Sequence, residues 1–226
     1  MGPGNGPFFF THWNFLVIEY VIEHNPDDRV LERAGRIIES GGLISFPTET
    51  NWVVVCNPFN KSAVEKLYRL RHIDNTKHLS VLCSDFSVAM EIAYISDNAF
   101  ALIKKVIPGP YTFIFEAQKK ITKFLKASKV DHQVGIRFPP NTLSKSIMAA
   151  CGGILLSTHL SHDMIEGSDH NFPLYSAIIE DNFSHLIDLI IDTGEIEFVG
   201  STTIIDFTSG VPEIHRVGAG NPAIFK

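Results

Sequence analysis

The stretch GGLISFPTETNWVVVC, residues 41–56, decides the fold of this chain. Two glycines suited to ending a helix precede an apolar strand predicted over 43–46, and a second apolar strand is predicted over Trp52–Cys56. Between the strands, Pro47-Thr48-Glu49-Thr50 forms a turn with two hydroxyls and one carboxylate. Because buried strands hold both ends of this turn, its polar groups converge where the strands part, which favours a binding site. The alternative is a loop whose hydroxyls only satisfy their own backbone.

Outside this stretch, apolar runs alternate with segments of helical periodicity. Strands are predicted over 16–22, 79–83, 111–117, 134–138, 154–157, 186–191, 204–207 and 213–217. Helices are predicted over 61–71, 85–93, 97–106, 121–127 and 141–150, with a mixed segment over 172–186. A helix before Gly41 should begin at Asn25-Pro26-Asp27, with Asn25 as its N-cap. This alternation predicts an α/β fold with one mixed, twisted sheet.

Length and composition exclude several classes of protein. The 226 residues are 45% hydrophobic and 19% charged, as in a compact globular domain. A net charge of −6 provides no overall basic field for nucleic acid or acidic membranes, although a local basic cleft stays possible. No apolar run reaches membrane-spanning length. Three cysteines, far apart in apolar runs and without CxxC spacing, indicate a reducing cytoplasm rather than disulfides or a metal site.

The first fifteen residues differ in composition from the rest of the chain. They combine Gly, Pro and an aromatic cluster, without the basic region or cleavage site of a signal peptide. We therefore interpret 1–15 as an N-terminal extension that need not be ordered, and 16–226 as one domain.

Isolated arginines and hydroxyl-rich turns are the candidate site residues. Arg69 and Arg71 at a helix end could satisfy the helix dipole or clamp phosphate, and Arg137 inside an apolar strand needs either an acidic partner or an anionic ligand. No Walker or GxGxxG motif occurs. The residues 157–163 (STHLSHD) lack the spacing of a hydrolase elbow or a metal site, so we assign no metal ligand and no catalytic residue. The residues alone predict a pocket for a small anionic or phosphorylated ligand.

An ordered series of motifs resembles the threonylcarbamoyl-AMP synthase family, the YrdC/YciO group, and within it the YciO branch most. The series runs PTET, RLR, PGPYTFIF, GIRFP, LST and STTIID, followed by the arginine before Val217-Gly218, and it spans roughly residues 17–220. The resemblance implies a twisted α/β sheet around a large, positively lined cavity. It also implies condensation of L-threonine, bicarbonate and ATP, with Mg2+, to threonylcarbamoyl-AMP and pyrophosphate. Other proteins of tRNA modification then act downstream.

The same motifs imply roles for individual residues. Thr48, Thr50, Thr202 and Thr203 would hold the threonine substrate. The nucleotide would be bound by a second set: Arg69, Arg71, Arg137, Ser161 and Arg216.

Several positions depart from the family pattern. The family's PTDTxYGL is PTETNWVVV here, and the lysine of its Lys-x-Arg pair is Arg69. Its Ser-Ala-Asn segment is His159-Leu160-Ser161, where Ser161 could substitute only at a shifted position; the YciO branch lacks that segment too. Two hypotheses follow: a synthase that makes threonylcarbamoyl-AMP, and a nucleotide- or double-stranded-RNA-binding protein without efficient synthase activity.

Overall fold

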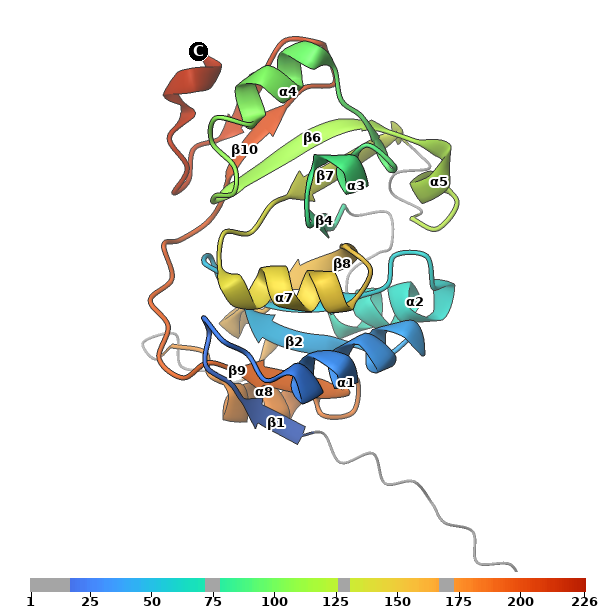
Figure 1. Ribbon diagram of the computed structural model, residues 1–226, viewed down its shortest axis with the longest axis vertical. Helices are drawn as coiled ribbons and strands as arrows, with labels where there is room; N and C mark the ends of the chain where they lie inside the picture. Colours follow the sequence, from blue (N-terminus) through green and yellow to red (C-terminus); the bar gives the residue numbers. More distant parts are fainter. Residues whose placement is uncertain (1–16, 72–77, 126–130, 167–172) are drawn as a thin grey trace, which may run out of the picture.

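The computed structural model describes residues 17–71, 78–125, 131–166 and 173–226. One mixed 11-stranded sheet organises them, in the order β1-β9-β2-β3-β8-β4-β7-β6-β10-β11, with β5 paired to β6 (Figure 1). The α/β fold class predicted from the alternation of elements is thus confirmed. The predicted extension 1–15 lies outside the described residues.

The strands and helices have the following bounds. The strands are β1 Val17–Tyr20, β2 Ile44–Pro47, β3 Trp52–Cys56, β4 Ser80–Cys83, β5 Ala93–Tyr94, β6 Tyr111–Ala117, β7 Gln133–Arg137, β8 Ile154–His159, β9 Leu189–Asp192, β10 Thr203–Asp206 and β11 Glu213–Arg216. The helices are α1 Asp28–Glu39, α2 Lys61–Leu70, α3 Phe86–Ala89, α4 Asp97–Ile103, α5 Lys119–Thr122, α7 Thr142–Ala150 and α8 Ser176–Phe183, with 3-10 turns η1 His162–Met164 and η2 Pro222–Phe225. Within these residues, no helix is both long and apolar enough to cross a membrane.

The stretch that decides the fold forms an antiparallel hairpin. Strands β2 and β3 pair from Ile44 opposite Val55 to Pro47 opposite Trp52, and every residue of both strands is buried. Gly41 ends the preceding helix segment in the left-handed region, at φ 83°, which glycine adopts without a side-chain clash. The two predicted strands and the turn between them are confirmed.

Helices cover the sheet on both faces and bury two apolar clusters. On one face, α1 and α7 lie side by side (Figure 1) over residues of β2, β3, β8 and β9. The other cluster joins α2 and α8 to β4, β6 and β7. The central strands are therefore buried on both faces, which explains why they are continuous apolar runs.

Several predicted boundaries are wrong. Asp27, not Asn25, is the N-cap of α1, because the Asp27 carboxylate accepts from the Arg29 amide at 2.9 Å. The predicted helix over 85–93 is only the four residues of α3, followed by the short strand β5. Asn141 precedes α7 as expected, but its side chain donates to the Pro47 carbonyl instead of capping the helix.

A long connection carries the chain from β9 to β10, across the width of the sheet. It comprises residues 193–202 and runs along one side of the molecule, drawn in orange-red (Figure 1). The Val199 amide donates to the Glu49 carbonyl at 3.0 Å, which ties this connection to the turn between β2 and β3. The connection thereby brings residues 201 and 202 next to the turn.

Candidate functional site

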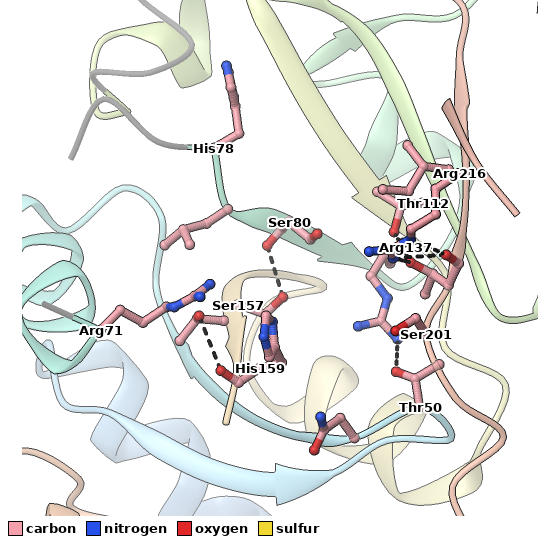
Figure 2. Close-up of a pocket in the computed structure, with 15 residues that line it drawn as sticks. Thr50, Arg71, His78, Ser80, Thr112, Arg137, Ser157, His159, Ser201 and Arg216 are labelled. Carbon is pink, nitrogen blue, oxygen red and sulfur yellow. Dashed lines mark hydrogen bonds between the residues drawn. The ribbon is translucent and has the colours of Figure 1, made fainter. Parts of the chain in front are cut away.

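A cavity of about 290 Å³ opens where the turn, the middle strands and the connection meet (Figure 2). Its described walls come from residues far apart in the sequence, and they are almost entirely polar. The lining residues are Thr50, Asn51, Arg71, His78, Leu79, Ser80, Thr112, Arg137, Ser157, Thr158, His159, Ser201, Thr202, Ile204 and Arg216.

Three arginines from separate elements share this cavity. Arg71 is the C-cap of α2, Arg137 ends β7 and Arg216 ends β11. No carboxylate is among the described residues that line it. A chain with a net charge of −6 thus holds a cavity of positive charge and hydroxyl groups, a combination suited to phosphate or carboxylate oxygens.

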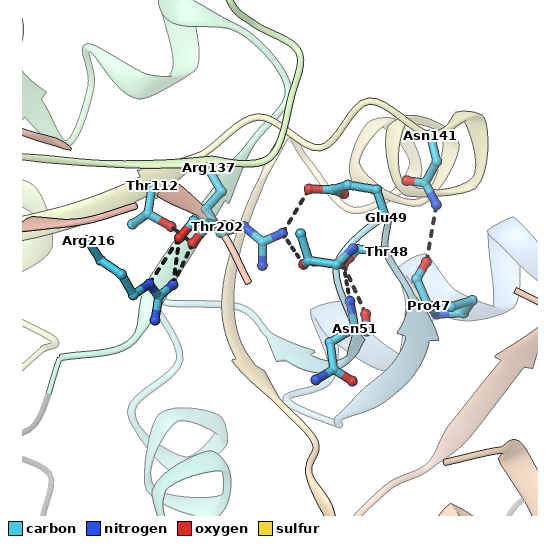
Figure 3. Close-up of polar contacts among 10 residues, drawn as sticks. Pro47, Thr48, Glu49, Asn51, Thr112, Arg137, Asn141, Thr202 and Arg216 are labelled. Carbon is cyan, nitrogen blue, oxygen red and sulfur yellow. Dashed lines mark hydrogen bonds and ion pairs between the residues drawn. The ribbon is translucent and has the colours of Figure 1, made fainter. Parts of the chain in front are cut away.

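Arg137 is held by the turn between β2 and β3 (Figure 3). Its Nη2 donates to Glu49 Oε1 at 3.0 Å and to Thr50 Oγ1 at 2.7 Å. The two charged side chains are only 8% and 10% exposed. Burial lowers the pKa of Arg137 and raises the pKa of Glu49, while the attraction between the two charges opposes both shifts. Of the two alternatives for Arg137, the acidic partner is present as Glu49, and the arginine also lines the cavity in which the other alternative, an anionic ligand, would bind.

Two polar atoms of this pair lack hydrogen bonds. Arg137 Nε and Glu49 Oε2 are buried, and neither has a partner among the residues that the structure describes. Burying a polar atom without a hydrogen bond costs free energy, so the environment of this ion pair is not fully satisfied.

Arg216 is fixed by the connection before β10. Its Nε and Nη2 donate to the Thr202 carbonyl at 3.0 and 2.9 Å, and Nη2 also donates to Thr202 Oγ1 at 3.0 Å. Thr202 Oγ1 lies 2.9 Å from Thr112 Oγ1 on β6 (Figure 3). One guanidinium nitrogen, Nη1, is left out of these bonds.

The sequence-predicted pair Arg69 and Arg71 does not converge. Arg71 lines the cavity, and its buried Nε has no hydrogen-bond partner within the described part of the chain. Arg69 is exposed and lines a different depression, with Lys66 and Asp188. Residues two positions apart on a helix point about 200° apart, which separates the two side chains. Ser161 precedes η1 and is not among the residues that line the cavity.

The four predicted threonines divide into two pairs. Thr50 and Thr202 line the cavity. Thr48 Oγ1 donates to the Asn51 carbonyl at 2.9 Å, which shapes the turn. Thr203 Oγ1 donates to the Gly220 carbonyl at 2.5 Å and accepts from the Gly218 amide at 2.9 Å. The hydroxyls of Thr48 and Thr203 therefore bond to backbone groups behind the lining and stabilise the cavity walls.

His159 is a cavity residue that the sequence did not assign. The predicted strand ended at Ser157, whereas β8 continues through His159 in register with β3. Burial lowers the pKa of His159, and the charges of Arg71, Arg137 and Arg216 lower it further, while Asp163 raises it. His159 is exposed to solvent, yet the neighbouring protein and the three arginine charges still disfavour its imidazolium form.

Thr112 and Ser80 are lining residues to which the sequence assigned no role, and Ser157, from the hydroxyl-rich run over 157–163, lines the cavity with them. Ser157 Oγ donates to the Ser80 carbonyl at 2.9 Å across the strand pair β4–β8. A hydroxyl inside an otherwise apolar predicted strand was the available signal for Thr112 and Ser80.

The described residues hold no group of three or more His, Cys, Asp or Glu side chains that could bind a metal ion. All three cysteines are free, and two of them are buried. Burial raises the pKa of each thiol, to about 12 at Cys151, so none is suited to act as a nucleophile.

Fold and cavity together define an α/β protein built around a cationic, hydroxyl-lined cavity. Residues 36–218 match the model of the Sua5/YciO/YrdC family, which carries the description "Telomere recombination". The chain belongs to this family.

Three relatives illustrate the range of similarity. The chain is 31% identical to Escherichia coli (strain K12) "Uncharacterized protein YciO" over 89% of this chain and 95% of the relative. The crystal structure of E. coli YciO superposes with a TM-score of 0.80 at 30% identity, covering 93% of this chain and 100% of that one. A "putative threonylcarbamoyl-AMP synthase" of Methanocaldococcus jannaschii is 25% identical over 85% of this chain and 87% of the relative. P. abyssi Sua5 complexed with L-threonine matches in fold, with a TM-score of 0.77 at 22% identity over 89% of this chain and 57% of that one.

Proposed function

We propose that this protein condenses L-threonine, bicarbonate and ATP to threonylcarbamoyl-AMP and pyrophosphate. The observation that carries the proposal is the cavity itself, with three arginines, many hydroxyls and no lining carboxylate among the described residues. ATP, bicarbonate and the carboxylate of threonine are all anions, and such a cavity suits them. The synthase name of the M. jannaschii relative and the L-threonine in P. abyssi Sua5 support this choice of substrates.

The proposed chemistry needs positioning and charge neutralisation more than a general base. Bicarbonate reacts with the threonine amine to form a carbamate and water. A carbamate oxygen then attacks the α-phosphorus of ATP, and the bond to the pyrophosphate leaving group breaks. Arg71, Arg137 and Arg216 would offset the negative charge that develops on the phosphate oxygens. Because no carboxylate lines the described cavity, Mg2+ would be carried by the phosphates of ATP rather than by the protein.

Residue roles follow from the positions of the side chains. Thr50 and Thr202 would contact the threonine substrate, while Thr48 and Thr203 would hold those two in place. Arg69 is exposed outside the cavity and would act on the nucleotide only as a distant charge. Ser161 does not line the cavity either, and it would contact only a part of the nucleotide that projects out of it.

Pyrophosphate release tests the proposal. The assay contains ATP, bicarbonate and Mg2+, with and without L-threonine. We expect a rate that depends on threonine. ATP binding by calorimetry without any threonine-dependent rate would overturn the synthase and favour the nucleotide-binding alternative, which would then be examined with double-stranded RNA.

Replacing Arg71 by alanine should weaken ATP binding about tenfold or more, because a charge-assisted hydrogen bond contributes about 1.5–3 kcal/mol. The loss should shrink as salt concentration rises, since salt screens the remaining charge interaction. Calorimetric titration with ATP at two ionic strengths measures both effects. Arg36→Ala, which removes an exposed arginine of α1 outside the cavity, is the matched control and should leave the affinity unchanged. Equal losses in the two variants would show a general charge effect and remove Arg71 from the site.

A further inference from the structure

His159 combines a fixed backbone position with a cavity-facing side chain. Strand pairing places it opposite Val53, and the next residue continues the pairing, since the Leu160 amide donates to the Trp52 carbonyl at 2.8 Å. Figure 2 shows the imidazole between Arg71 on one side and Arg137 on the other. The ring therefore lies among the positive charges of the cavity.

Positive charge predominates around this ring. Arg71, Arg137 and Arg216 act on it from α2, β7 and β11, while Asp163 of η1 acts in the opposite sense. Two further titratable groups lie nearby: His78 lines the cavity, with its Nε2 2.5 Å from Asp131 Oδ2, and Glu49 lies behind the lining, paired with Arg137. A proton on His159 is accordingly disfavoured while the cavity holds no anion.

An anionic ligand would reverse this balance. The phosphates of a nucleotide carry several negative charges, and bound against the arginines they would also lie close to His159. We propose that His159 is an additional ligand-binding residue, which takes a proton from solvent when a nucleotide polyphosphate enters the cavity and then contacts it as an imidazolium. This inference rests on the proposed function and adds a residue to the nucleotide contacts proposed there.

Proton uptake and ligand binding are then thermodynamically linked. Since the ligand favours the protonated ring, the protonated ring favours the ligand by the same factor. For each unit by which the bound ligand raises the pKa of His159, the ligand binds about tenfold more tightly at low pH. The gain should appear as pH falls through the pKa of His159 in the complex, and it should level off below the pKa in the empty cavity.

The test compares wild type with His159→Gln, which keeps a polar side chain of similar length but cannot become charged. ATP without Mg2+ is titrated calorimetrically at about pH 8 and about pH 5.5, either side of the usual histidine pKa. The two proteins differ only at residue 159 and are titrated with the same ligand, so the ratio of their affinities for ATP isolates His159. His24→Gln, at an exposed histidine before α1, is the control.

We expect the wild-type advantage to grow about tenfold from the higher to the lower pH, with net proton uptake that is smaller in the variant. The control should follow wild type at both pH values. ATP binding with a constant ratio would overturn this inference and leave the proposed function standing. Failure of both proteins to bind ATP at either pH would overturn the nucleotide site and this inference with it.

Discussion

Replacing Arg137 by alanine should abolish threonine-dependent pyrophosphate release and lower the affinity for ATP at least a hundredfold. Arg137 is the most buried of the three cavity arginines, and its Nη2 already positions Thr50 at the cavity wall. The substitution removes both the charge and the contact that orients the turn. Removing a buried, hydrogen-bonded charge lowers affinity more than removing a charge at the rim of a site.

The same substitution should also destabilise the fold. Glu49 would remain buried without its partner, and breaking a buried ion pair on one side costs about 3–5 kcal/mol. Chemical denaturation measures this loss of stability as a lower denaturant concentration at the midpoint of unfolding. An unchanged midpoint would mean that solvent reaches Glu49 and that the pair is not buried as described.

A double variant separates the loss of ligand binding from the loss of stability. Glu49→Leu with Arg137→Met replaces the ion pair by apolar side chains of similar volume, an exchange that is often neutral for stability. We expect the double variant to regain most of the stability while remaining unable to bind ATP. Recovery of ATP binding together with the fold would show that Arg137 supports the structure and does not contact the ligand.

Replacing Gly218 by alanine should destabilise the protein by about 3 kcal/mol, the upper part of the range for overpacking. A methyl group at Gly218 would lie 2.2 Å from the Ser201 carbonyl oxygen and 2.6 Å from the Thr202 carbonyl carbon. These contacts are with backbone, so neither side can give way by rotating a side chain. The chain after β11 must therefore move away from the connection. This movement breaks the hydrogen bond that the Ala219 amide donates to the Ser201 carbonyl.

The effect of Gly218→Ala should extend to the ligand. Thr202 and Arg216 both line the cavity, and Arg216 donates to the carbonyl of Thr202, the same backbone that a methyl group at Gly218 would displace. We expect weaker ATP binding at temperatures where the variant is still folded. Thermal unfolding and calorimetry measure the two effects.

Gly135→Ala is the matched control for this glycine. A methyl group there would meet only Thr112 Cγ2, at 3.5 Å, an ordinary contact. Its unfolding temperature should stay close to that of wild type. Equal destabilisation by the two substitutions would show that the close approach at Gly218 is not the cause.

Local sequence patterns determined most of the architecture. The hairpin around PTET, the end of α1 at Gly41 and the arginine in β7 follow from apolar runs, glycine conformation and turn chemistry within a few residues. Errors occurred where the competing signals were also local. At α1, both Asn25 and Asp27 are good caps, and the bond from Asp27 to the Arg29 amide decided between them.

The convergence of the site was decided only by the tertiary structure. Arg71, Arg137 and Arg216 lie far from one another in the sequence, and sheet order together with the connection over 193–202 makes them neighbours. The same packing excludes Arg69 from the cavity and brings in His159. A residue's type and local structure are properties of its own segment, whereas the charge that surrounds it is the sum over every segment packed against it, and no single stretch of sequence contains that sum.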